Sequence, residues 1–158
     1  MSSEIPLSDV KSSYVRTGAS LIYQVFGRKI MFYSKRRLVD IYKQFSGLEF
    51  GSEGIELQEF MRTQKYPLYY NEGGTYVYRD YFISLLEEMP NISFLKYAYF
   101  EGLTLGSDIL AKVVNIFKNA VNFGDIESAK KELMDLNLDI QDGFAYKDTA
   151  YVKEGFDE

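Results

Sequence analysis

The clearest hydrophobic pattern in the chain is the segment YPLYYNEGGTYVYRDYFISLLEE. Its runs YPLYY and TYVYR are rich in aromatic and β-branched residues, and the intervening NEGG tolerates the positive φ of a tight turn, so a β-hairpin is predicted. Helical spacing follows, with apolar residues at i, i+4, i+7 and i+11 and a proline after the last. The pattern therefore predicts a short helix whose apolar stripe is Tyr78, Phe82, Leu85 and Met89.

Other segments carry weaker versions of these two patterns. Apolar residues at helical spacing, with capping residues or glycines at their ends, predict helices over residues 8–26, 35–45, 108–123 and 126–136. Alternation predicts strands over residues 27–34 and 91–105, and again in the tail from Asn137. In the second helix, Leu38, Ile41, Tyr42 and Phe45 are expected to face inward.

These elements predict an α+β fold with a small mixed or antiparallel sheet and about five helices. At 158 residues the chain can bury one core and is short for two, so we expect a single domain over residues 1–158, with an acidic, frayed end at 153–158. No apolar run approaches the length of a membrane span, and the first residues lack a secretion signal. A soluble, intracellular protein without membrane contact is expected.

Cysteine and histidine are both absent from the sequence. Disulfides, thiolate metal sites, cysteine nucleophiles, serine-histidine triads and histidine-bound zinc are thereby excluded. If the protein is an enzyme, its chemistry falls to Asp, Glu, Lys, Tyr or Ser. Carboxylates holding a hard divalent cation such as Mg²⁺ are the most plausible arrangement.

Charge is divided unevenly along the chain, whose net charge is −5. Residues 1–45 hold eight Lys and Arg against three acids, whereas the remainder holds ten against twenty. Five basic residues bracket the predicted strand over 27–34: Arg28, Lys29, Lys35, Arg36 and Arg37. Such side chains could bind nucleic-acid phosphates without reading sequence, although basic residues are also ordinary on a protein surface.

The acidic candidates lie in or next to the predicted helix after the hairpin. Glu87 faces away from the apolar stripe, Glu88 is on its flank, and Asp80 lies two turns earlier. A solvated helix face is the alternative interpretation of all three. Further upstream, Gly51-Ser52 before Glu56 suggests the nucleotidyltransferase signature, but the second acid of that signature is missing, so nucleotide transfer is not predicted.

The lack of Cys, His and Trp, the fourteen tyrosines and the hairpin-helix segment TYVYRDYFISLLEE resemble proteins of filamentous viruses that infect thermophilic archaea. Among these, the chain is similar to the small nuclease of Acidianus filamentous viruses. The resemblance implies a fold distantly like nucleotidyltransferases, cleavage of double-stranded DNA, a location in the cytoplasm of the infected host cell, and dependence on one helical glutamate. Glu87 matches that glutamate, with Glu88 second.

The expected mechanism is phosphodiester hydrolysis in which Glu87 binds Mg²⁺ or accepts a proton from the attacking water. Asp80 is the candidate metal ligand beside it, but two turns separate the pair, so the fold would have to supply another acid. The basic cluster would hold the phosphates. The alternative is a non-enzymatic viral regulator or inhibitor that binds a host protein or nucleic acid. Exposed tyrosines could also stack on bases, although strand tyrosines more often pack against their neighbours.

Overall fold

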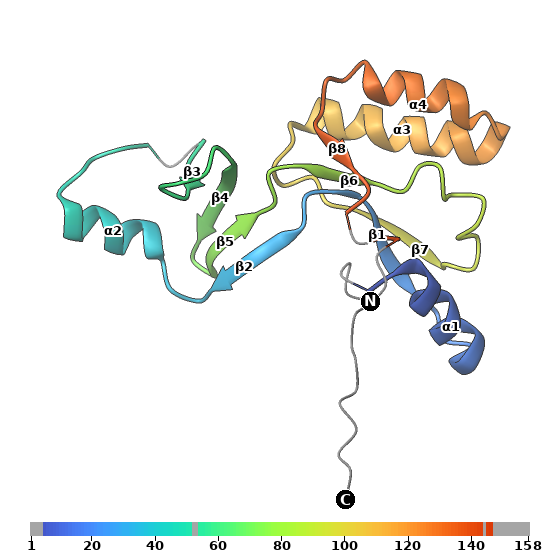
Figure 1. Ribbon diagram of the computed structural model, residues 1–158, viewed down its shortest axis with the longest axis horizontal. Coiled ribbons are helices and arrows are strands. Elements are labelled where there is room, and N and C mark those ends of the chain that lie inside the picture. Colours follow the sequence, from blue (N-terminus) through green and yellow to red (C-terminus); the bar gives the residue numbers. More distant parts are fainter. Residues whose placement is uncertain (1–4, 52–53, 144, 147–158) are drawn as a thin grey trace, which may run out of the picture.

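Two four-stranded sheets organise the chain in the computed structural model, which describes residues 5–51, 54–143 and 145–146 (Figure 1). The elements are α1 (Leu7–Thr17), β1 (Ile22–Gly27), β2 (Ile30–Ser34), α2 (Leu38–Ser46), β3 (Glu56–Gln58), β4 (Lys65–Asn71), β5 (Gly74–Tyr78), β6 (Phe82–Ser84), β7 (Tyr97–Phe100), α3 (Ser107–Phe123), α4 (Ile126–Met134) and β8 (Ile140–Gln141). The α+β class is confirmed, with four described helices where about five were predicted. The predicted frayed end at 153–158 lies outside the described residues.

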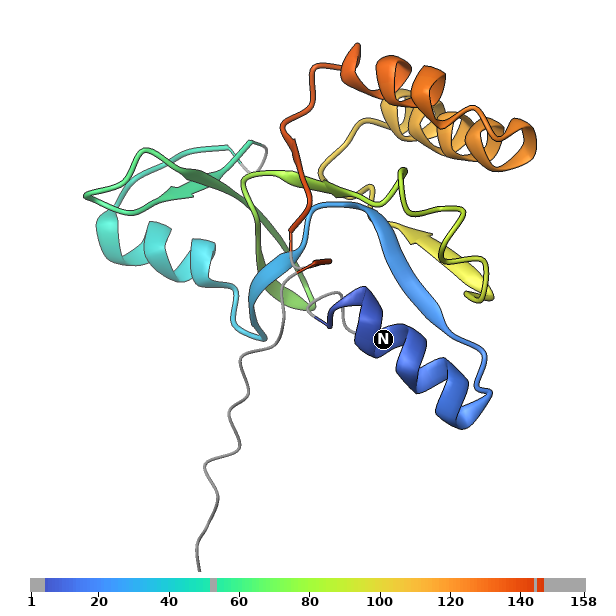
Figure 2. The same cartoon turned by 45° about the vertical axis from the view of Figure 1, so that its right-hand side comes forward.

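The first sheet is mixed and has the order β7-β1-β6-β8. Strand β1 pairs in parallel with β7 and antiparallel with β6, and β8 pairs in parallel with β6. Helices α3 and α4 lie side by side on one side of this sheet and α1 lies on the other (Figures 1 and 2). The main core therefore sits here, around Phe26, Phe117 and Leu85, because both faces of the central strand are covered.

The second sheet is antiparallel and has the order β2-β5-β4-β3. Its centre is the predicted hairpin, which is confirmed: β4 and β5 pair with Tyr69 opposite Tyr76 and Asn71 opposite Gly74. The chain passes from β1 to β2 through Gly27, whose φ of 115° suits glycine. A Cβ there would collide with Glu101. The two sheets are thus joined by short connections, from β1 to β2 and from β5 to β6 (Figure 2).

The predicted helix over 8–26 is wrong in its second half. Helix α1 ends at Thr17 because Gly18 adopts a left-handed conformation with φ 62° and its N–H bonds to the Tyr14 carbonyl. Residues from Ile22 onward form β1 instead. All but the first residue of that strand are buried, and a strand buried on both faces shows no alternation to distinguish it from a helix.

The predicted helix after the hairpin is also wrong. Phe82 and Ile83 belong to β6, which pairs with β1 and β8, and hydrogen-bonded turns follow as far as residue 94. Phe82 and Leu85 are buried as their apolar character suggested. Pairing with strands far away in sequence therefore outweighs the local helical spacing.

The helices predicted near the C-terminus are confirmed. In α3 the buried residues are Val113, Ile116, Phe117 and Ala120. Asp125 caps α4 by accepting a 3.0 Å hydrogen bond from the Ser128 N–H. No helix in the described ranges has the length and apolar character that crossing a membrane requires.

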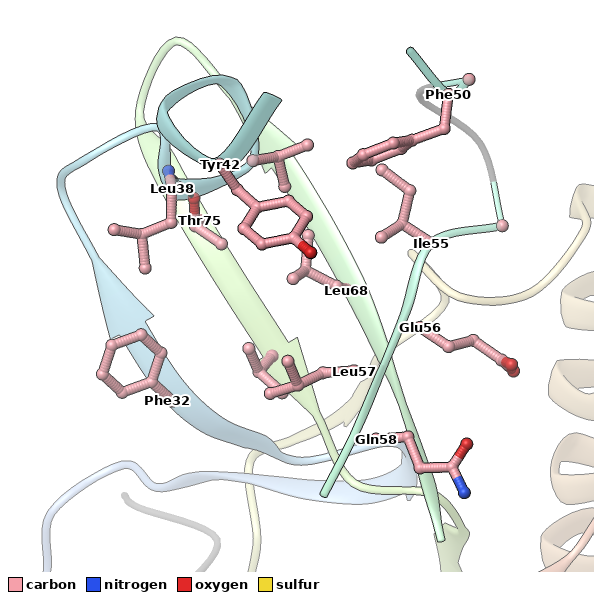
Figure 3. Close-up of a pocket in the computed structure, with 14 residues that line it drawn as sticks. Phe32, Leu38, Tyr42, Phe50, Ile55, Glu56, Leu57, Gln58, Leu68 and Thr75 are labelled. Carbon is pink, nitrogen blue, oxygen red and sulfur yellow. Dashed lines mark hydrogen bonds between the residues drawn. The ribbon is translucent and has the colours of Figure 1, made fainter. Parts of the chain in front are cut away.

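Helix α2 forms where it was predicted, and the face that it turns to the sheet matches the prediction in part, because Leu38 and Tyr42 line the space between the helix and the sheet. Val39 is its buried residue, whereas Phe45, expected to face inward, is 90% exposed. The helix does not close over the sheet but leaves an apolar cavity of about 730 Å³ (Figure 3). The close-up shows Tyr42 of α2 above Leu68 of the sheet, with Phe50 and Ile55 on the other side of the cavity.

Candidate functional site

The predicted basic cluster divides into two parts with different surroundings. The Arg28 guanidinium donates a 3.0 Å hydrogen bond to the Arg79 carbonyl and lies 4.4 Å from the centre of the Phe82 ring. Burial lowers the pKa of Arg28, which the nearby carboxylates of Asp80 and Asp139 partly oppose. Lys29 is only 5% exposed. Arg28 is half-buried and Lys29 is buried, so both side chains are poorly placed to bind a polyanion.

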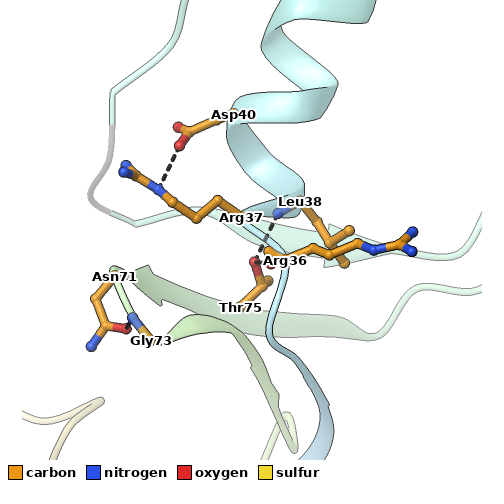
Figure 4. Close-up of polar contacts among 7 residues, drawn as sticks. All are labelled: Arg36, Arg37, Leu38, Asp40, Asn71, Gly73 and Thr75. Carbon is orange, nitrogen blue, oxygen red and sulfur yellow. Dashed lines mark hydrogen bonds and ion pairs between the residues drawn. The ribbon is translucent and has the colours of Figure 1, made fainter.

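The second part is exposed and lies in the connection from β2 to α2. Arg37 pairs with Asp40 at 2.6 Å, and its guanidinium lies 5.8 Å from the Tyr70 ring centre. Figure 4 shows Arg36 and Arg37 extending in opposite directions from the start of α2. Within the described ranges, the side chains of Lys35 and Arg36 form no ion pair. We call Lys35 and Arg36 the basic link; of the five predicted residues, these two are freest to contact phosphate.

The basic link is held by strand β5. The Thr75 hydroxyl donates to the Arg36 carbonyl at 2.8 Å and accepts from the Leu38 N–H at 3.0 Å (Figure 4). Arg37, at the N-cap of α2, makes no side-chain capping bond, so Thr75 supplies from a distant strand what a capping residue usually provides. Gly74, with φ 132°, lies so close to the Ser34 carbonyl that a Cβ would not fit.

Three tyrosines stand next to one another on the antiparallel sheet, and we call Tyr33, Tyr76 and Tyr69 the tyrosine ladder. Tyr33 is paired with Tyr76 across β2 and β5, and Tyr76 with Tyr69 across β5 and β4. The ring centres are 4.8 Å and 6.3 Å apart. Tyr33 is 46% exposed and Tyr69 38% exposed, so the outer rings are open to solvent. Their strand neighbours Phe32, Val77 and Leu68 line the cavity under α2, so the ladder occupies the opposite face.

The sequence suggested base stacking by tyrosines but could not select this set. The strand register that joins the three rings depends on β2, which is distant in the chain from the β4–β5 hairpin. Tyr33 also donates a 2.9 Å hydrogen bond to the Gly73 carbonyl in the hairpin turn. The ladder therefore begins beside the basic link, at the turn end of the hairpin.

Glu87, the predicted catalytic residue, lies in a cleft of about 410 Å³ bounded by the end of β6, α4 and the segment around β8. Its carboxylate forms an ion pair with Lys130 of α4. The hydrogen bond and the charge of Glu87 raise the pKa of Lys130. Asp142 and Tyr146 line the same cleft. Asp142 is a second acid that the sequence analysis missed, because nothing local links it to Glu87.

Glu88, the second catalytic candidate, is held by two hydrogen bonds. Its Oε1 accepts from the Tyr146 hydroxyl at 2.7 Å and its Oε2 from the Asn91 amide at 3.1 Å. Burial and the bond to Glu88 both raise the pKa of Tyr146, so this tyrosine stays protonated at neutral pH. Glu88 therefore fixes the chain near residue 146 against the turn that follows β6.

Asp80, the predicted metal ligand, does not line the cleft of Glu87 and instead lies near Arg28. Among the residues that the structure describes, no three acidic side chains gather closely enough to hold a metal ion. Mg²⁺ binding stays a prediction. The basic link and Glu87 are not brought together. The basic link follows β2 of the antiparallel sheet, whereas Glu87 follows β6 of the mixed sheet, and the two segments lie toward opposite ends of the molecule (Figures 1 and 2).

Comparison with known proteins gives one curated relative to report. The chain is 26% identical over 148 residues to the tRNA hydroxylation protein P2 of Bacillus subtilis (strain 168). The match covers 81% of this chain and 48% of that protein, so the chain spans about half the length of its relative. No protein-family model matches the chain, and no solved structure matches it either. The resemblance to small viral nucleases and the likeness to nucleotidyltransferases stay predictions.

Proposed function

We propose that this chain binds RNA in a tRNA-modification system, through the basic link and the tyrosine ladder. The observation that carries the proposal is the similarity to the tRNA hydroxylation protein P2, which extends over 81% of the chain. Zero cysteine and zero histidine leave the chain without the usual ligands for a redox metal, so a binding role suits it better than the hydroxylation chemistry itself.

The surface described above has the two features that RNA contact requires. Lys35 and Arg36 are exposed cations, which neutralise phosphates and release counterions whatever the sequence. The open rings of Tyr33 and Tyr69 offer faces on which unpaired bases stack, a contact of about 1–3 kcal/mol per base. Both features lie at one end of the antiparallel sheet, so a single strand of RNA could contact them together.

The test is the binding of bulk bacterial tRNA, measured by fluorescence anisotropy at several salt concentrations. The double variant Lys35→Ala/Arg36→Ala should weaken binding and reduce the salt dependence by about two phosphate contacts. The matched control removes two exposed lysines of α3, Lys112→Ala/Lys118→Ala, and should bind as the wild type does. Equal losses in both double variants, or no tRNA binding by the wild type, would refute the proposal.

The Mg²⁺-dependent nuclease inferred from the sequence is a second candidate, and one arrangement favours it. The expected mechanism needed an acid besides Glu87, and Asp142 lines the same cleft, where Lys130 of α4 forms an ion pair with Glu87. Glu87 and Asp142 are the residues that would hold Mg²⁺ in this cleft, and the ion would supply positive charge beside the phosphate. Lys130 would then stabilise negative charge on the phosphate oxygens. The attacking water would form the new P–O bond and release a proton, while the P–O bond to the leaving oxygen breaks and that oxygen takes up a proton.

This candidate is tested by incubating linear duplex DNA with the protein, with and without Mg²⁺. Cleavage that requires Mg²⁺ and is abolished by Glu87→Gln, but not by Glu132→Gln on the exposed side of α4, would support it. Intact DNA under all conditions would refute it. DNA that is retarded but intact would favour the non-enzymatic alternative, a regulator that binds nucleic acid.

A further inference from the structure

An apolar cavity lies between α2 and the antiparallel sheet. At about 730 Å³ it falls within the range of small-molecule binding pockets. Apolar side chains from α2, the sheet and the segment 54–57 surround it (Figure 3). The hydroxyl of Thr75 is already engaged by the backbone at the start of α2. The interior of the cavity therefore suits an alkyl chain better than a polar group.

The edge of the cavity carries a positive charge. The Lys43 ammonium lies 4.8 Å from the ring centre of Phe50, and the Phe50 and Tyr42 rings, which both line the cavity, are 6.3 Å apart. No carboxylate pairs with Lys43 in the part of the chain that the structure describes. The acid that lines the cavity, Glu56, is paired with Lys65 at 3.3 Å and points away from the space (Figure 3).

We propose that this cavity binds an amphipathic carboxylic acid, with its alkyl chain between α2 and the sheet and its carboxylate at Lys43. The apolar lining selects the alkyl chain by removing it from water, and the Lys43 ammonium at the edge selects a negative head group over a neutral or positive one. The cavity lies on the face of the sheet opposite the tyrosine ladder. The two proposed sites thus lie on different surfaces, and either proposal can be refuted without the other.

The test is isothermal titration with saturated fatty acids of eight to twelve carbons, below the concentrations at which they form micelles. Burial of each added methylene should tighten binding about fourfold until the cavity is filled. The alcohol of the same length should bind about two- to fivefold more weakly, since the contact with a partly exposed lysine is modest. Affinity that does not depend on chain length, or no binding at all, would overturn the proposal.

Variants locate the site. Leu57 is 49% exposed and lines the cavity, so Leu57→Asp should fold and should weaken binding at least tenfold by placing a charge against the alkyl chain. Met61→Asp, at an 87% exposed position outside the lining, is the matched control and should bind normally. Lys43→Gln should bring the acid to the affinity of the alcohol. Equal effects of Leu57→Asp and Met61→Asp, or unchanged preference for the acid in Lys43→Gln, would place binding elsewhere.

Discussion

Thr75 gives the sharpest test of how the basic link is held. It is fully buried in β5, and its hydroxyl joins the Arg36 carbonyl and the Leu38 N–H. Thr75→Val keeps the shape of the side chain and removes both hydrogen bonds. Thr75→Ser keeps both bonds and removes one methyl group. The pair of variants therefore separates the polar contribution of this residue from its packing.

The expected losses follow from these contacts. Each hydrogen bond contributes about 1 kcal/mol, so Thr75→Val should lower the free energy of unfolding by about 2 kcal/mol. A buried polar group left without any hydrogen bond would cost more than this. That cost does not apply in full here, because the Leu38 N–H and the Arg36 carbonyl also bond to each other at 3.0 Å. Thr75→Ser should lose about 1 kcal/mol, the value of one buried methyl group.

Urea unfolding followed by circular dichroism measures both losses. With a slope of about 2 kcal/mol/M, the midpoint of Thr75→Val should fall by about 1 M and that of Thr75→Ser by about half as much. Hydrogen exchange adds an independent measurement, since the Leu38 amide should lose protection in the valine variant alone. A valine variant as stable as the wild type, or more stable than the serine variant, would refute this account of the link.

Three further substitutions probe other parts of the fold. Gly74→Ala, which forces a Cβ against the Ser34 carbonyl at φ 132°, should cost more than about 1 kcal/mol in urea unfolding, whereas Gly106→Ala, which meets no atom within 4 Å, should cost less; equal losses would contradict the geometry. Asp125→Ala should lower stability by about 1 kcal/mol through loss of the α4 cap, and an unchanged melting temperature would contradict this. Burial raises the pKa of Tyr23 from about 10 to about 12, so the folded state favours the neutral phenol and its stability should fall as pH rises through this interval. Tyr23→Phe should flatten that fall in unfolding measured from pH 9 to 12, and identical slopes would contradict the assignment.

Elements with strong local signals could be predicted from the sequence. The β4–β5 hairpin depends on the NEGG turn, and α3 on an apolar stripe at Val113, Ile116, Phe117 and Ala120 that ends at a glycine. In both, the residues that specify the element are close together in the chain, so local pattern and tertiary structure agree.

The errors occur where pairing over long distances decides the structure. Phe82 and Leu85 fit a helical stripe, but the segment from Phe82 to Ser84 pairs with β1 and β8 in the mixed sheet. Val25 likewise fits a helix and belongs to a strand buried on both faces. The strands that pair with these segments lie far away in the sequence, so a local window cannot show that the segments are strands.

The candidate site was only partly predictable for the same reason. The sequence placed Arg28, Lys29, Lys35 and Arg36 in one cluster, because they flank one strand. The fold half-buries Arg28 and buries Lys29 at the junction between the sheets, and it exposes Lys35 and Arg36 where β2 meets α2. Whether a basic side chain is exposed depends on which strands pack against that part of the segment. Those strands come from distant parts of the chain, so the local sequence does not specify the exposure.

Strand β5 shows how one short element can serve several sites at once. Alternate residues of a strand face opposite sides of its sheet, so Tyr76 joins the tyrosine ladder while Thr75 and Val77 line the cavity under α2. Thr75 also holds the start of α2, and with it the basic link. A change at Thr75 should therefore affect both RNA binding and ligand binding, whereas a change at Tyr76 or Leu57 should affect only one of them. The two proposed sites are separate surfaces with one common support, strand β5 of the predicted hairpin.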